Sequence, residues 1–205
     1  MKKKIKMITM KKILIMIIGV FAFNNIQAQG TMKDPVSFKL KNGIEVVVAE
    51  NSGMGKVFAS VKIDGEPVST NAAVSDVLTN LLTEGAIHKS KVAFANNGKD
   101  IAPKVNINAE EGNVAADAED FENAFLVLSS AIQKPEMDKE AVDKANKNAE
   151  HSISFDELKT FYNQQIKPSR TYITIAGDIT LAEAKALTKK AFGEWKENQE
   201  TAIAK

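Results

Sequence analysis

Apolar and polar positions repeat in two regular ways along this chain. Val57–Ile63 places apolar residues at every second position, and that period predicts a half-buried strand. Ala72–Thr83 repeats its apolar residues three and four positions apart, which predicts a helix, with Gly85 beyond its end. The Asn42-Gly43 pair between two apolar runs predicts a tight β-hairpin. Strands and helices are therefore mixed within the first half of the sequence.

The segment Ser154–Trp195 marks its own elements most fully. Ser154 and Thr180 each precede a glutamate by three residues, which is the spacing of a helix-capping box. Pro168 predicts the end of the first of these helices, because proline removes a backbone donor. β-Branched and aromatic residues at 171–176 predict a strand between the two helices. The segment is therefore predicted to fold as helix, strand, helix.

The middle of the chain predicts one more hairpin and two more helices. Strands are expected at 105–109 and 114–116, joined by a turn at 110–113. Asp120 is expected to cap a helix that closes before Pro135, and 138–150 is helical by propensity. The resulting order of elements lacks the regular βαβ alternation of a doubly wound fold, so it predicts the α+β class.

The N-terminus reads as a secretory signal peptide covering residues 1–28. Met1–Lys12 carries six lysines, residues 13–23 are continuously apolar, and residues 24–28 supply a polar exit ending in a small residue. The apolar core is short for a bilayer span, although an uncleaved membrane anchor is the alternative interpretation. The chain has no cysteine, which excludes disulfides and lipid attachment through a cysteine. We therefore expect an exported protein, periplasmic or secreted.

The net charge of the mature protein limits the classes of partner that it is expected to bind. Removing residues 1–28 takes away six of the 27 basic residues and none of the 26 acidic ones, which leaves a net charge of −5. Nucleic acid is therefore not expected as a partner, and neither is a membrane after signal cleavage. The length that remains suits one compact core, so we expect a single domain at 29–197 followed by a polar tail at 198–205.

Three stretches of the sequence, in the same order, resemble the pitrilysin/insulinase family of zinc metallopeptidases. They are the hairpin Phe38–Val48, the helix Ala72–Ala86, and the closing pattern with Ile175-Ala176-Gly177-Asp178 and Phe192-Gly193-x-Trp195. The resemblance covers residues 36–195. It implies a mitochondrial-processing-peptidase-like domain, which is an α+β domain with a mixed, mostly antiparallel sheet and helices packed on one face.

The same resemblance points to a missing metal site. In active members the helix matching Ala72–Ala86 carries His-x-x-Glu-His, whose spacing puts two metal-binding imidazoles and a water-activating carboxylate on one face. Alignment on Gly85-Ala86 places Asp76, Thr79 and Asn80 at these three positions. Because none of them is histidine, we expect no catalytic residue, no metal ligand and no cofactor.

A zinc site built from other residues is the alternative. Such a site needs three or four ligands, and the chain offers only His88, His151 and carboxylates. Both histidines are expected at helix ends or in exposed loops. The third ligand of the family is a glutamate on a later helix, where Glu140 or Glu150 could lie. The alternative function is thus a zinc metalloendopeptidase with unconventional ligands, such as Asp76 with Glu140 or Glu150.

Other catalytic chemistry finds no support in the sequence. No Gly-x-Ser-x-Gly string is present for a serine hydrolase. The leading hypothesis is therefore an exported non-catalytic domain that acts as the partner of an active peptidase subunit or binds peptide or protein. Helix faces or a sheet edge that accepts an extended peptide would be its working surfaces. A structural binding domain unrelated to proteolysis is the third hypothesis.

Overall fold

The computed structural model describes residues 31–65, 72–95 and 103–197. Its strands are β1 (Thr31–Met32), β2 (Val36–Lys39), β3 (Glu45–Ser52), β4 (Lys56–Ile63), β5 (Val105–Ile107), β6 (Glu111–Asp117) and β7 (Thr171–Gly177). Its helices are α2 (Ala72–Ala95), α3 (Ala118–Gln133), α4 (Lys139–Lys147), α5 (Phe155–Gln165) and α6 (Leu181–Phe192). The predicted signal peptide and the polar tail lie outside the described residues.

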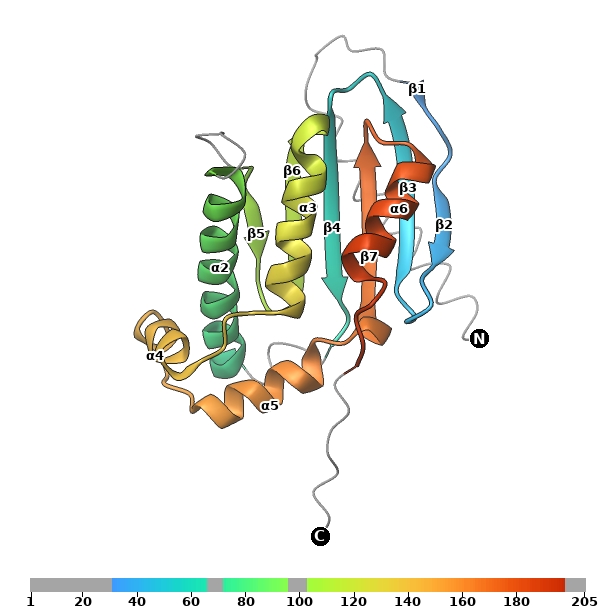
Figure 1. Ribbon diagram of the computed structural model, residues 1–205. Helices are drawn as coiled ribbons and strands as arrows, with labels where there is room; N and C mark the ends of the chain where they lie inside the picture. The colour runs from blue at the N-terminus through green and yellow to red at the C-terminus, as the bar shows by residue number, and fades with distance from the viewer. Residues whose placement is uncertain (1–30, 66–71, 96–102, 198–205) are drawn as a thin grey trace.

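The strands form one mixed sheet in the order β1-β3-β7-β4-β6-β5, and β2 also pairs with β3 (Figure 1). β3 and β7 run parallel, while every other described pair is antiparallel. β7, from the end of the chain, lies between β3 and β4, which follow each other directly in sequence. The predicted α+β class and mostly antiparallel sheet are therefore confirmed.

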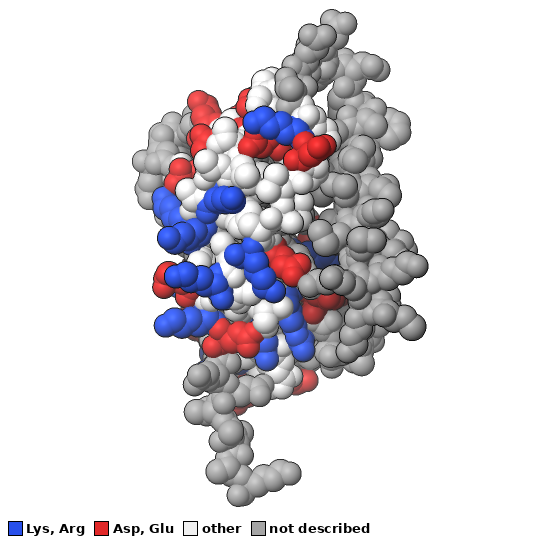
Figure 2. Space-filling model, turned by 90° about the vertical axis from the view of Figure 1, so that its right-hand side faces the viewer, with Lys and Arg blue, Asp and Glu red and all other residues white. Residues whose placement is uncertain are grey.

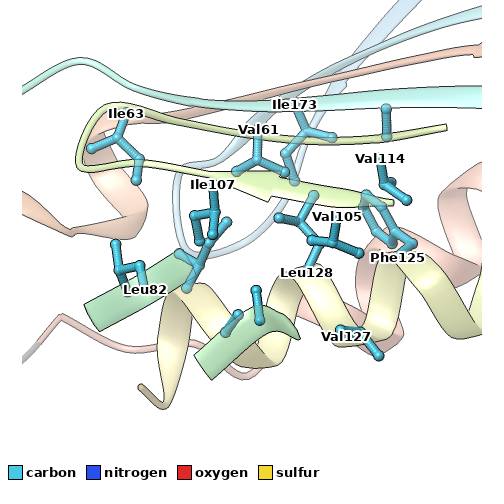
Figure 3. Close-up of a cluster of buried hydrophobic side chains, with 14 of the residues drawn as sticks. Val61, Ile63, Leu82, Val105, Ile107, Val114, Phe125, Val127, Leu128 and Ile173 are labelled. Carbon is cyan, nitrogen blue, oxygen red and sulfur yellow. The ribbon is translucent and has the colours of Figure 1, made fainter. Parts of the chain in front are cut away.

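Helices α2, α3 and α6 cover one face of the sheet, while α4 and α5 lie at its lower end in Figure 1. The core forms between the sheet and this helical layer, as Figure 3 shows, with strand side chains such as Val61 and Ile173 directed toward Leu128 and Phe125 of α3. None of the described helices is both long enough and apolar enough to span a membrane. The fold therefore has a single core on one side of its sheet.

Local signals in the sequence place the hairpin and two helix starts correctly. Gly43 adopts φ 96° in the turn between β2 and β3, a conformation that glycine tolerates without strain. The Ser154 hydroxyl accepts a hydrogen bond from the Glu157 N–H (3.2 Å) at the start of α5. At α6, Thr180 and Glu183 form a reciprocal capping box. These three predictions are confirmed.

Helix α2 is longer than the sequence pattern predicts. It continues through Gly85 to Ala95, and Gly85 is not among the residues with positive φ. The reason is burial: Ala86, Ser90 and Phe94 continue the buried stripe of the helix past the glycine. Gly85 is therefore an interior residue of α2, and His88 lies on the helix instead of in a loop, contrary to the sequence prediction.

The β5–β6 turn lies earlier than predicted. The Asn108 side-chain oxygen accepts hydrogen bonds from the N–H groups of Glu110 and Glu111 (both 2.8 Å) and so closes the turn itself. β6 then begins at Glu111, and Gly112 belongs to the strand. A Cβ on Gly112 would lie 2.6 Å from Leu128 Cδ1, so this glycine lets α3 approach the sheet closely. The predicted bounds of both strands were wrong for this reason.

The start of α3 also differs from the prediction. Asp117, not Asp120, is the residue that precedes the helix, and its backbone is extended (φ −61°, ψ 148°). Asp117 is also the last residue of β6, where it pairs with Lys56. The strand therefore turns directly into the helix with no loop between them. Asp120 lies in the first turn, where its negative charge complements the helix dipole.

Helix α4 is shorter than the predicted helix at 138–150. Asp138 caps its start by accepting a hydrogen bond from the Ala141 N–H (2.8 Å). In its last turn, the Asn146 side chain donates to the Ile153 carbonyl and accepts from the Ile153 N–H, both at 2.9 Å. This pair of bonds folds the chain back toward α5, so the helix cannot continue to residue 150.

We expect Gly85→Ala to stabilise the protein by about 0.5–1 kcal/mol, because alanine is preferred over glycine in a helix interior. Apart from the backbone of α2 itself and the two chain neighbours, no atom of the described residues lies within 4 Å of the position that the new Cβ would take. Chemical denaturation measures the change. Gly177→Ala is the matched control and should destabilise, because Gly177 has φ +131° and its Cβ would meet Lys56 O at 2.3 Å. A loss of stability in Gly85→Ala would contradict an unbroken α2.

Candidate functional site

Two threonines of α2 bind the turn between β5 and β6. The Thr79 hydroxyl accepts a hydrogen bond from the Ala109 N–H (3.2 Å). One helical turn later, the Thr83 hydroxyl donates to the Ile107 carbonyl (2.9 Å). Both bonds satisfy backbone groups at the end of β5. β5 is the edge strand on this side of the described sheet, so no further described strand pairs with its outer side. Thr79, at the central position of the family's metal motif, therefore supports the edge of the sheet.

The neighbouring polar residues of α2 bind helix α4. The Asn80 side-chain amide donates to the Ala145 carbonyl (3.3 Å). The Glu84 carboxylate binds Lys144 (2.6 Å) through one oxygen and Asn148 (3.2 Å) through the other. The hydrogen bond that the Lys144 ammonium donates to Glu84 raises the pKa of Lys144 above its ordinary value. Asn80, at the second histidine position of the motif, therefore joins two helices.

Asp76, at the first histidine position, is exposed near the start of α2. The spacing of Asp76, Thr79 and Asn80 puts them on one side of α2, but only Asp76 is exposed. Thr79 and Asn80 are half-buried, and they contact the β5–β6 turn and α4, respectively. A threonine hydroxyl and an asparagine amide are also not the nitrogen, sulfur or carboxylate ligands that zinc takes.

The candidate ligands of the alternative zinc site lie apart from this face. His88 Nδ1 is 3.6 Å from Glu136 Oε1 on the exposed surface. Glu140 lies on the outer face of α4, and Glu150 and His151 are exposed between α4 and α5. Within residues 31–65, 72–95 and 103–197, no three His, Cys, Asp or Glu residues are grouped as a metal site would require. The arrangement of these residues gives the alternative site no support.

A shallow groove between α2 and α3 was not predicted from the sequence. It has a volume of about 390 Å³, and its lining combines apolar with polar and charged residues. The lining residues are His88, Lys89, Val92, Ala93, Asn123, Leu126, Val127, Ser130 and Glu136. Val92 is 48% exposed, which is high for a large apolar side chain on a helix of the core layer. The apolar Val92-Ala93 pair beyond Gly85 was the available signal, but the predicted helix ended before it.

Comparison of the sequence with protein families gives one match. A model described as "Peptidase M16 inactive domain" matches residues 152–205. This is the part of the chain in which the helix, strand, helix pattern is most complete. None of the curated proteins matches the sequence significantly.

Solved structures similar to this one include two proteases and one peptidase M16 inactive domain. The periplasmic protease PqqL from Escherichia coli aligns with a TM-score of 0.65 at 14% identity, over 82% of this chain and 25% of that one. The ferredoxin protease FusC, in complex with Arabidopsis ferredoxin, aligns with a TM-score of 0.64 at 14% identity. The alignment covers 83% of this chain and 25% of that one. A peptidase M16 inactive domain from Pseudomonas fluorescens aligns with a TM-score of 0.61 at 14% identity. This alignment covers 84% of this chain and 53% of that one.

The chain thus spans between a quarter and about half of the length of these structures. At this level of identity the structural likeness establishes the fold. The family model adds agreement in sequence over the closing segment. The chain therefore has the fold of an M16, insulinase-like peptidase domain and resembles the inactive domains of that family.

Proposed function

We propose that this chain is an exported, non-catalytic M16-like domain that binds a protein partner, namely an active peptidase subunit, through its helical layer. The observation that carries the proposal is that polar residues of α2 form structural hydrogen bonds. Thr79 and Asn80, at two of the three metal-motif positions, hold the β5–β6 turn and α4 in place. A helix that holds zinc in active members of the family acts here as a structural support.

The groove between α2 and α3 supports the choice of the helical layer as the binding surface. The apolar residues of its lining and the exposed side chain of Val92 are features of a surface that a protein covers. The similar structures also contain two to four times as much chain as the aligned domain. In these structures the aligned domain is therefore accompanied by further polypeptide, which supports a protein as the partner proposed here.

The sheet edge at β5 is a weaker surface for binding an extended peptide. β5 has three residues, and the Ile107 carbonyl already accepts a hydrogen bond from Thr83. β-Augmentation needs a row of free backbone groups along an edge strand. This edge therefore offers a peptide few hydrogen bonds, and we place the partner on the helices.

We expect Thr79→Val to lower the free energy of unfolding by about 1 kcal/mol, because the Ala109 N–H loses its acceptor. Thr79→Ser keeps the hydroxyl and is the matched control, so its free energy of unfolding should fall by less than that of Thr79→Val. Chemical denaturation of the two variants and the wild type measures the difference. Equal stability of Thr79→Val and the wild type would mean that the hydroxyl is not structural.

We expect the mature chain to contain far less than one equivalent of zinc when it is purified without added metal. Elemental analysis of the protein measures this directly. The control is a triple variant that restores the family motif, Asp76→His, Thr79→Glu and Asn80→His, measured after the same purification. One equivalent of zinc in the wild type would contradict the proposal and favour the unconventional peptidase.

We expect the tagged mature chain to recover an M16 peptidase with an intact His-x-x-Glu-His motif from an extract of its own source. Val92→Asp, which puts a charge into the groove, should weaken recovery about tenfold or more. Met32→Asp makes the same change at another exposed apolar residue, on β1, and should not weaken it. Mass spectrometry identifies and quantifies the recovered protein. Recovery without any such peptidase, or equal loss in both variants, would contradict the proposal.

A further inference from the structure

The exposed side of α6 and the tip of the β2–β3 hairpin carry a group of lysines. We call this surface the basic face and define it by Lys41, Lys185, Lys189, Lys190 and Lys196, all of which are exposed. Figure 2 looks onto this side of the molecule and shows basic side chains gathered across its middle. The residues from 29 onward are acidic overall, with a net charge of −5, so the charge on this face is opposite to that of the whole chain.

The fold brings these lysines together from two distant parts of the sequence. The Asn42 side chain donates to the carbonyls of Phe192 (2.7 Å) and Trp195 (2.9 Å), which fixes the hairpin tip against the end of α6. Lys41 and Lys196 are the immediate neighbours of two of these residues. On the other side of the face, Lys185 Nζ lies 5.4 Å from the centre of the Phe38 ring. The arrangement is therefore held by specific contacts.

Most of this positive charge is not neutralised within the described structure. Lys190 forms an ion pair with Glu122 (2.7 Å). No described carboxylate lies within ion-pairing distance of Lys41, Lys185, Lys189 or Lys196, although Glu194 is exposed nearby. The dipole of α6 accounts for Lys189 and Lys190, which lie in its last turn. It does not account for Lys41 on the hairpin or Lys185 in the middle of the helix.

We propose that the basic face binds a short acidic segment of a protein. Four lysines without a described carboxylate partner offer charge complementarity to a run of aspartate and glutamate. The half-buried rings of Phe38 and Trp195 lie among them and offer apolar contact. Charge of this kind acts within a Debye length of about 8 Å at physiological salt. A short acidic segment bound there therefore interacts with the lysines of the basic face and not with the acidic remainder of the protein.

Larger polyanions are disfavoured by the same argument. A nucleic acid or an anionic membrane extends beyond the face and meets the acidic remainder of the protein, which repels it. This inference goes beyond the partner proposed above and involves the α6 side of the helical layer, not the groove between α2 and α3. Its test uses a free peptide, so it does not depend on whether an active peptidase subunit binds the groove.

The test is a titration of a fluorescent decaglutamate peptide with the mature chain, followed by fluorescence anisotropy. We expect binding that weakens as salt is raised from about 20 to about 300 mM. The triple variant Lys41→Gln, Lys185→Gln and Lys189→Gln should raise the Kd about tenfold or more. Changing the same three lysines to arginine should preserve binding. This variant shows that any loss comes from charge and not from altered folding.

The matched control removes three lysines elsewhere, with Lys91→Gln, Lys139→Gln and Lys147→Gln, all at exposed positions on α2 and α4. Its Kd should stay within about twofold of the wild-type value. The same protein is also tested against vesicles of anionic phospholipid and against a DNA duplex. Absence of peptide binding, equal loss in the control, or tighter binding to vesicles or DNA than to the peptide would overturn the proposal.

Discussion

Burial of one face of the sheet under α2, α3 and α6 is the interaction on which the rest of the structure depends. The side chains that fill this layer come from every strand longer than two residues except β2, and each fully buried one contributes about 1.5–3 kcal/mol. The other face has no described helix against it. α2 packs against β5 and α3 in this layer. Its polar residues then meet the ends of β5 and α4, and the site described above is a consequence of this packing.

Features encoded by neighbouring residues were predictable from the sequence. The hairpin at Asn42-Gly43 and the helix starts at Ser154 and Thr180 depend on contacts a few residues apart, and all three are confirmed. Features set by distant contacts were not. Gly85 has low helix propensity, but burial of Phe94 nine residues later keeps α2 intact. The turn at Asn108 was missed because a side chain, and not the more turn-like Gly112, closes it.

In the candidate site, too, one part could be predicted from the sequence and another part could not. Loss of the metal motif at Asp76, Thr79 and Asn80 follows from residue identities and could be stated from the sequence. The new roles of Thr79 and Asn80 could not, because their partners lie 30 and 65 residues away. A chain that lost its ligands without replacing their contacts would leave the backbone of the β5–β6 turn unsatisfied. Thr79 and Asn80 supply such contacts here, which supports the proposal that α2 has a structural role.

The position of β7 between β3 and β4 has a consequence for how the protein folds. β3 and β4 are joined by a short turn, and adjacent strands of this kind readily pair with each other during synthesis. In the native sheet they are kept apart by a strand that is made more than a hundred residues later. The nascent chain must therefore leave these two edges unpaired, or separate them again, before β7 enters. We therefore expect this late insertion to slow folding and to leave both edges open to aggregation until β7 is in place.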